Sequence, residues 1–154
     1  KAIDHNSFTF FDKALVSDAN SDSELVGVKN QNLMSTVLLF NLALCFHIAG
    51  VNQGIDQQAN LRKALRLYCM AVDVLNAESD ECENPLVALA IANNMGSIYA
   101  HFFQADEVNQ CLDWIRCVLE ETCPMQFGEG EDYSLFHMNV ILLEGYEIHV
   151  AAAA

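Results

Sequence analysis

Six cysteines are the residues of this chain best suited to chemistry. Cys111, Cys117 and Cys123 recur every six residues, and on an α-helix a step of six residues turns the side chain by more than a right angle. They cannot converge as zinc ligands without breaking the helix, and the sequence contains no Cys-x-x-Cys pair. We therefore predict no metal site and no cofactor. The other three cysteines are Cys45, Cys69 and Cys82.

Other catalytic patterns are equally incomplete. Cys45 and His47 could supply a thiol nucleophile and a base, but nothing fixes them within reach, and the signatures of cysteine hydrolases are missing. Gly128-Glu129-Gly130 lacks the third glycine and the following lysine of a phosphate-binding loop. We predict a protein that is not an enzyme, and a metal- or thiol-dependent enzyme is the remaining catalytic alternative.

The charge of the chain limits its partners. There are 21 acidic residues against seven lysines and arginines, which gives a net charge of -14, and Arg116 is the only Lys or Arg after Glu78. Such a field repels nucleic acid and anionic membrane surfaces. Arg62, Lys63 and Arg66 form the one basic cluster, which we interpret as a solvated helix face rather than an anion site.

Cysteine usage and hydropathy bear on the compartment. Cys45 lies inside an apolar segment and Cys69 between Tyr68 and Met70, which is typical of core cysteines in a reducing compartment. No signal peptide is recognisable, and we expect no uncharged apolar run of about 18 residues that would insert into a membrane. The prediction is an intracellular protein, cytoplasmic unless an N-terminal segment before Lys1 carries an organellar address.

These side chains have to be positioned by helices. A chain of 154 residues with 53% hydrophobic content and two prolines favours one all-α domain. Thr36–Gly50 is apolar almost all round, whereas Leu61–Leu75 has one apolar face, formed at helical spacing by Leu61, Ala64, Leu65, Tyr68, Ala71, Val72 and Leu75. Together they predict a helical hairpin.

The helix boundaries are predicted from capping residues. Ser35 is placed as the cap of the first helix and Gly50 as its stop, and the polar stretch Val51–Asn60 is placed as a long connection that ends in a capping Asn60. Pro85 suits the first turn of a third helix ending at Phe103. A fourth helix opens at Asp106 and Glu107 and carries the apolar stripe Val108, Cys111, Leu112, Ile115, Val118 and Leu119, and a fifth helix covers Tyr133–Val150.

The N-terminal region lacks a clear helical pattern. Phe8 and Phe10 alternate as in a short strand, while the spacing of Phe11 and Ala14 also fits a helix, and we favour an extended arm over Lys1–Val16. The polar stretch Ser17–Asn32 is predicted to be a loop. The expected layout of the single domain 1–154 is an arm and loop over 1–35, a hairpin over 36–78 with an insertion at 51–60, a second hairpin over 85–121, and a closing helix over 133–154.

A short pattern recurs in the first, third and fifth helices. It reads Asn41-Leu42-Ala43-x-x-Phe46, then Asn94-Met95-Gly96-x-x-Tyr99, and more weakly Asn139-Val140-Ile141. With Ala64, Tyr68 and Ala71 in the second helix, the pattern resembles the tetratricopeptide repeat. The Asn-aliphatic helices, the long insertion and the terminal alanines are more specifically similar to divergent tetratricopeptide-like proteins of diatoms.

The resemblance implies a short superhelix of stacked hairpins whose first helices line a groove for a protein or peptide. The carboxylate clamp of some family members is not expected, because Phe40 and Leu44 stand where it needs Lys and Asn, which favours a more apolar partner. The resemblance thus implies an interaction scaffold; the alternative is a structural subunit that forms a homodimer or docks into a larger assembly through its ends and convex face. The groove residues implied by register are Phe40, Leu44, His47, Asn93, Asn94, Ser97 and His101.

Overall fold

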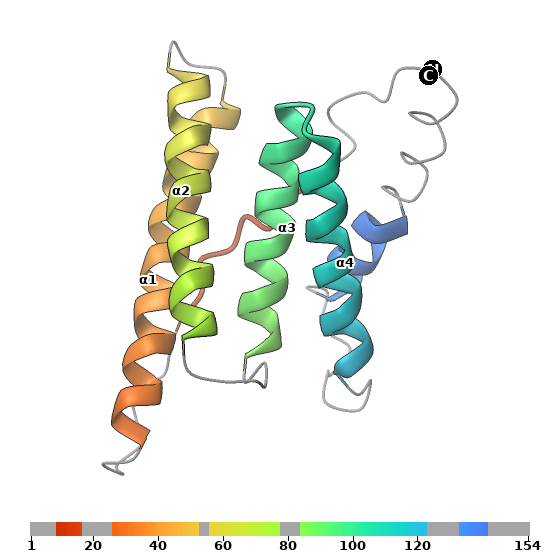
Figure 1. The fold of residues 1–154 in the computed structure, drawn as a ribbon. Coiled ribbons are helices and arrows are strands. Elements are labelled where there is room, and N and C mark those ends of the chain that lie inside the picture. The colour runs from red at the N-terminus through yellow and green to blue at the C-terminus, as the bar shows by residue number, and fades with distance from the viewer. Residues whose placement is uncertain (1–8, 17–25, 53–55, 78–83, 123–132, 142–154) are drawn as a thin grey trace. The chain divides into compact units, whose positions relative to one another are not determined.

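The computed structural model describes residues 9–16, 26–52, 56–77, 84–122 and 133–141, with side chains from residue 31 onward in the first helix. Four helices and a fifth helical segment over 133–141 account for most of these residues, and no strand occurs among them, which confirms the all-α class. The elements in Figure 1 are α1 (Val26–Val51), α2 (Gln57–Asn76), α3 (Pro85–His101) and α4 (Ala105–Glu121).

The chain divides into two compact units. Unit 1 comprises Lys1–Phe11 and Ala92–Ala154, and unit 2 comprises Asp12–Ile91. One boundary therefore lies in the N-terminal segment and the other lies inside helix α3. Each unit is described by itself below.

Unit 2 is built on the hairpin of α1 and α2, which run side by side in opposite directions (Figure 1). The predicted face of α2 is the one that is buried, through Leu61, Ala64, Tyr68 and Ala71. Phe40 of α1 meets Tyr68 with ring centroids 5.6 Å apart. Removing such a large side chain from water stabilises the fold by about 1.5–3 kcal/mol.

Helix α1 begins earlier than predicted. Residues 26–32 are helical, so the predicted loop over Ser17–Asn32 is wrong in its second part, and its first part lies outside the described residues. Ser35 is not a cap, because it lies inside the helix, where its hydroxyl donates to the carbonyl of Gln31 at 2.8 Å. A helix already nucleated extends cheaply through polar residues, each of which costs only some tenths of a kcal/mol relative to alanine.

The connection between α1 and α2 is shorter than predicted. Helix α2 begins at Gln57 after Asp56, and the amide of Asn60 donates to the carbonyl of Asp56 at 2.9 Å. Asn60 therefore lies in the first turn of α2 and is not its cap. The amides of a first helical turn lack intrahelical partners, so polar residues such as those at 57–60 are common there. Their polarity alone therefore led to the start of α2 being predicted too late.

Gly50 has a packing role instead of the predicted stop. It lies inside α1, and no described glycine has a positive φ. A Cβ atom at this position would lie 2.7 Å from both Cγ and Cδ2 of Leu61. The absence of a side chain thus allows the end of α1 to approach the start of α2 closely.

Helix α1 overturns the expectation that no uncharged apolar run reaches about 18 residues. Gln31–Val51 is 21 residues long and is apolar enough to cross a membrane by length and composition, and it carries no acidic or basic residue except His47. The core helix of a soluble protein passes the same test. Here one side of α1 packs on α2, with Phe40, Ala43, Leu44 and His47 buried.

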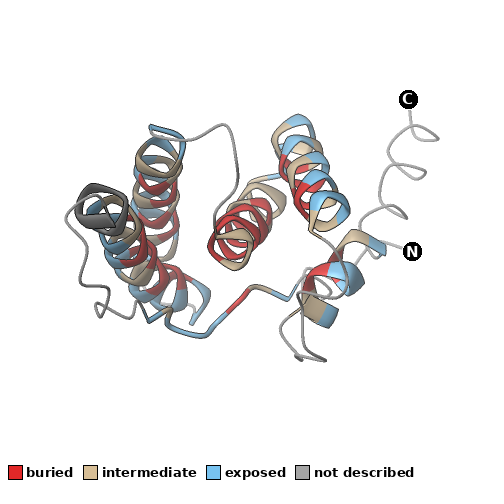
Figure 2. Ribbon diagram, turned by 90° about the horizontal axis from the view of Figure 1, so that it is seen from below, coloured by how far each residue is buried: buried red, intermediate tan, exposed pale blue. Residues whose placement is uncertain are grey.

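Helix α3 is buried on all sides over part of its length. Eight consecutive residues, from Val87 to Asn94, are buried, and the buried positions appear as a continuous red segment in Figure 2. Pro85 opens the helix, as predicted. A helix that is apolar all round is expected where it is covered on several faces.

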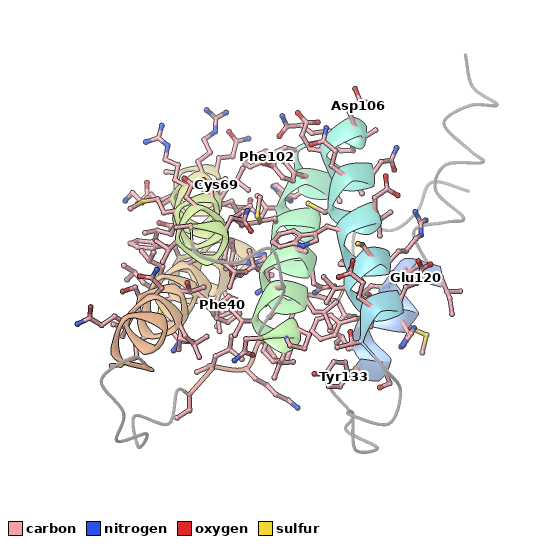
Figure 3. All side chains as sticks on the ribbon, turned by 60° about the horizontal axis from the view of Figure 1, so that its bottom comes forward. Phe40, Cys69, Phe102, Asp106, Glu120 and Tyr133 are labelled. Atoms are coloured by element: carbon pink, nitrogen blue, oxygen red, sulfur yellow. The ribbon has the colours of Figure 1, made fainter. Side chains whose placement is uncertain are left out.

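Unit 1 contains the second part of α3, helix α4 and the helical segment 133–141. The predicted apolar stripe of α4 is confirmed, with Val108, Cys111, Leu112, Ile115 and Val118 buried. Val108 and Leu112 pack with Tyr99 and Ala100 of α3 and with Val140 of the fifth segment. Asp106 and Glu120, labelled in Figure 3, are exposed on α4.

The turn between α3 and α4 contains a residue in the left-handed region. Phe103 has a φ of 58°, which is the only positive value recorded for a described residue other than glycine. The amide of Gln104 donates to the carbonyl of Tyr99 at 3.0 Å, and that of Phe103 donates to Ala100 at 3.1 Å. This is the Schellman arrangement, with Phe103 where glycine is the usual residue.

Candidate functional site

Residues 9–16 form an arm that is neither helix nor strand and that bends at Lys13, so the helical alternative is wrong for this part. The rest of the predicted arm, residues 1–8, lies outside the described residues. In an extended chain the amide and carbonyl of one residue point to the same side, and those of the next residue point to the opposite side. Thr9 and Phe11 therefore present their backbone groups on one edge. Thr9, Phe11 and Leu15 each bond through their backbone to an asparagine side chain.

In unit 1, Asn94 of α3 pairs with Phe11 through both backbone groups. Its Oδ1 accepts from the Phe11 amide at 2.7 Å, and its Nδ2 donates to the Phe11 carbonyl at 2.9 Å. Asn94 is fully buried. A carboxamide offers one acceptor and one donor side by side, so it replaces the backbone edge of a neighbouring β-strand.

Thr9 is held in the same way by Asn139 of the fifth helical segment. Asn139 Oδ1 accepts from the Thr9 amide at 3.4 Å, and its Nδ2 donates to the Thr9 carbonyl at 2.5 Å. The same carbonyl accepts from Asn93 Nδ2 at 3.2 Å. Asn139 Nδ2 also donates to Asn93 Oδ1 at 2.7 Å, and Asn93 Nδ2 donates to Asn94 Oδ1 at 3.4 Å, so the three side chains form one network.

We call Asn93, Asn94 and Asn139 the asparagine cluster. Beside it, the side chain of Phe11 is 3% exposed and stacks on Phe136, with ring centroids 5.7 Å apart. Phe136 is fully buried and meets Tyr133 edge to face. Thr9, by contrast, is exposed. The site thus bonds to the backbone of two arm residues and buries the side chain of only one.

Unit 2 contains one further pairing of this kind. Asn41 Oδ1 accepts from the Leu15 amide at 2.9 Å, and its Nδ2 donates to the Leu15 carbonyl at 2.8 Å. Leu15 is half-buried, and its neighbours Ala14 and Val16 are exposed. The backbone of the arm is therefore recognised at this point, with little contribution from adjacent side chains.

Three of the residues implied as groove residues lie elsewhere. Phe40, labelled in Figure 3, contacts Tyr68 of α2, and His47 Nδ1 lies 3.4 Å from the Tyr68 hydroxyl. Leu44 is 4% exposed on the same helix. Phe40 and His47 belong to the interior of the α1–α2 hairpin, because both are buried and contact Tyr68. The neighbouring Asn41 bonds to the arm instead.

The candidates from α3 divide into two groups. Asn93 and Asn94 are brought together and contact the arm. Ser97 and His101 are half-buried on the same helix, and His101 lies edge to face with Phe102 at 5.4 Å. Neither has a bond to the arm among the contacts of the described residues.

Sequence reasoning did not include Asn41, Asn139, Phe136 or Phe11 among the site residues. A signal was present, because an asparagine recurs at the same place in three apolar helices. Asparagine is a poor helix former, and when buried it requires hydrogen-bond partners. The partner itself leaves no local pattern, since Phe11 and Asn94 are separated by 83 positions.

The cysteines are distributed differently from the prediction. Cys45 is exposed, so its assignment to the core is wrong: it lies on the side of α1 away from Phe40 and Ala43. Cys69 is half-buried, and the Cys117 thiol donates to Glu121 Oε1 at 3.3 Å. Within the described ranges, no three His, Cys, Asp or Glu side chains gather as a metal site; Cys82 and Cys123 lie outside those ranges.

The solvated basic face of α2 is as predicted. Arg62, Lys63 and Arg66 are exposed, and the Lys63 ammonium lies 5.4 Å from the ring centroid of Phe46. Such a cation–π contact at an exposed site contributes about 0.5–1 kcal/mol. This surface therefore has a structural use.

Comparison with known proteins identifies no relative. No protein-family model matches the sequence, no curated protein matches it, and no solved structure matches the chain.

Proposed function

We propose that this chain is a non-catalytic interaction module that binds an extended segment of a partner protein through asparagine side chains. The observation that carries the proposal is the paired bonding of Asn94 to the amide and carbonyl of Phe11. Asn139 repeats it on Thr9, and Asn41 repeats it on Leu15 in unit 2. An intracellular, reducing location is part of the same proposal.

The physical basis is that an asparagine carboxamide has the same donor and acceptor as a peptide group, so it can bind the backbone of an extended segment. When an extended peptide adds to a sheet edge, backbone hydrogen bonds give affinity and pockets for side chains give specificity. Here carboxamides on helices supply the donor and acceptor instead of a strand. Each such bond contributes about 0.5–1.5 kcal/mol net, and leaving a buried asparagine unpaired costs about 1–3 kcal/mol.

A tetratricopeptide-like organisation is the second part of the proposal. The recurrence of asparagine at one place of the first, third and fifth helices supports it, because equivalent positions in stacked hairpins share a function. The recurring residues Asn41, Asn94 and Asn139 each bond to the arm.

N-methylation of a peptide backbone tests the function. The protein in this test is the full chain with Phe11→Ala, a substitution that weakens the binding of its own arm to the asparagine cluster. It is titrated with a fluorescent peptide of residues 6–16. N-methylation at the peptide position of Phe11 removes the donor to Asn94, and we expect an affinity loss of about tenfold or more. N-methylation at the position of Asp12, whose amide lies on the opposite edge, is the matched control and should leave affinity within about twofold.

Backbone recognition would be wrong if both methylated peptides bound as tightly as the parent peptide. Asn94→Asp in the protein gives an independent check, because a carboxylate keeps the acceptor and loses the donor. We expect this variant to bind the parent peptide with lower affinity. Circular dichroism verifies that its helices are intact.

A structural subunit of a larger assembly is the second candidate. One face of α1 carries exposed apolar side chains four residues apart, which we call the outer stripe: Met34, Leu38 and Leu42. Leu38 is 66% exposed, and contiguous exposed apolar surface of this kind marks contact sites. Light scattering after size exclusion separates the two functions, since a subunit assembles with itself or with partners and Leu38→Glu with Leu42→Glu should abolish the assembly.

A further inference from the structure

The segment that occupies the site in unit 1 indicates which kind of partner sequence the site prefers. Thr9–Phe11 is already seated on the asparagine cluster, and it shows what chemistry fits there. The inference below rests on the proposed function and adds the sequence preference and the control of the same site.

Two residues of the arm, Thr9 and Phe11, show which partner sequences this site prefers. Thr9 contributes backbone groups and has an exposed side chain, so its position tolerates many residues. Phe11 contributes backbone groups and a side chain that is 3% exposed and stacked on Phe136. Stacked aromatic pairs add stability beyond the area that they bury, so this position selects an aromatic residue.

The charge of the protein further limits which partner segments can bind. The chain carries a net charge of -14, and the asparagine cluster itself is uncharged. The arm has one acidic and one basic residue, Asp12 and Lys13, both exposed. An acidic segment would be repelled by the field of the protein, whereas a neutral or basic segment would be tolerated or attracted.

We propose that the asparagine cluster and Phe136 form a site for an extended, neutral or basic segment of a partner protein with an aromatic residue at the Phe11 position, and that Thr9–Phe11 is its built-in competitor. The partner must displace the arm before it binds. Its apparent affinity is reduced by the fraction of molecules in which the arm is seated.

The test uses the full chain in its native form and with Phe11→Ala, and fluorescent peptides of residues 6–16 with either Phe or Ala at the position of Phe11. We expect the Phe peptide to bind the Phe11→Ala chain about tenfold or more tighter than the native chain. The Ala peptide should bind the same variant at least about tenfold more weakly than the Phe peptide.

A second measurement needs no variant. In the native chain, saturating Phe peptide should speed hydrogen exchange at the amide of Phe11, because binding displaces the arm, while exchange in α2 is unchanged. This measurement tests whether the peptide displaces the arm even if Phe11→Ala impairs folding.

The outcomes separate the two proposals. Equal binding of the Phe and Ala peptides overturns the aromatic preference and leaves the proposed function standing. Equal binding to both chains, with unchanged exchange at Phe11, overturns the built-in competition. Failure of every peptide to bind a folded Phe11→Ala chain, with no change in exchange in the native chain, overturns the proposed function and this inference with it.

Discussion

Asn94 forms hydrogen bonds with both backbone groups of Phe11, 2.7 Å to the amide nitrogen and 2.9 Å to the carbonyl oxygen. A residue in the middle of a buried helix thus serves as the docking edge for an extended segment 83 positions earlier in the chain. The two bonds form together or not at all, because one rigid carboxamide makes both.

Asn94→Asp should release Phe11 from its site. The carboxylate cannot donate, so it meets the Phe11 carbonyl with like charge, and we expect the amides of Thr9 and Phe11 to exchange at least about tenfold faster. Hydrogen exchange followed by mass spectrometry or NMR measures this. Asn76→Asp adds the same charge at an exposed site of α2 and serves as the control.

The same experiment with Asn41→Asp should have its effect elsewhere. Asn41 pairs with Leu15, so exchange should rise at the Leu15 amide. A uniform loss of protection through the helices in either variant would mean that the asparagines support folding in general and not the arm in particular.

Thr36→Val should stabilise the protein by about 1 kcal/mol. Thr36 is fully buried, and its Oγ1 has no hydrogen-bond partner among the described residues. Valine keeps the shape, has a similar helix propensity and removes the unpaired group. Urea unfolding measures the change.

Thr122→Val is the matched comparison, because the Thr122 hydroxyl donates to the Val118 carbonyl. This variant should lose stability. Equal effects of the two substitutions would show that the Thr36 hydroxyl is satisfied.

Gly50→Ala should destabilise the hairpin by about 1–3 kcal/mol, although alanine is the better helix former. The new Cβ would lie 2.7 Å from Leu61 Cγ. Leu61→Ala removes that atom and costs about 2–5 kcal/mol by itself.

The double variant tests the cause. If the clash with the Leu61 side chain is responsible, Gly50→Ala should cost much less in the Leu61→Ala background, where only the Leu61 backbone nitrogen at 3.2 Å remains close, and the two effects should be far from additive. Additive losses in thermal or urea unfolding would assign the cost of Gly50→Ala to some other contact.

Phe103→Gly should be more stable than Phe103→Ala by about 1 kcal/mol. Both substitutions remove a side chain that is 70% exposed, and they differ in the cost of the φ of 58° at this position. Calorimetry measures the difference. Alanine as stable as glycine would contradict the left-handed conformation of this turn.

Local periodicity predicted much of the fold. The buried face of α2, with Tyr68 and Ala71, and that of α4, with Val108 and Leu112, follow the expected spacing, and Pro85 marks a true helix start. Such features depend on residues three or four positions apart, which a single sequence displays directly.

Boundaries and long-range contacts were harder to predict. Ser35 has the right type for a cap, but α1 continues past it to Val26, because a nucleated helix extends through polar residues at little cost. Asn94 was a candidate by resemblance, whereas Phe11, its partner, was placed only in an arm. Nothing in a local pattern states which segment a buried asparagine meets.

The hydrogen bonds between Thr9 and Asn139 have a consequence for the order of events during synthesis. The two residues are 130 positions apart, so Thr9 is made long before Asn139, and the bonds between them form only after the fifth helical segment is made. Contacts of such sequence separation form late, and domains fold while synthesis proceeds. Leu15 and Phe11 precede their partners Asn41 and Asn94 by 26 and 83 positions, so these pairings can form before Asn139 is made, and the hold on Thr9 is completed last.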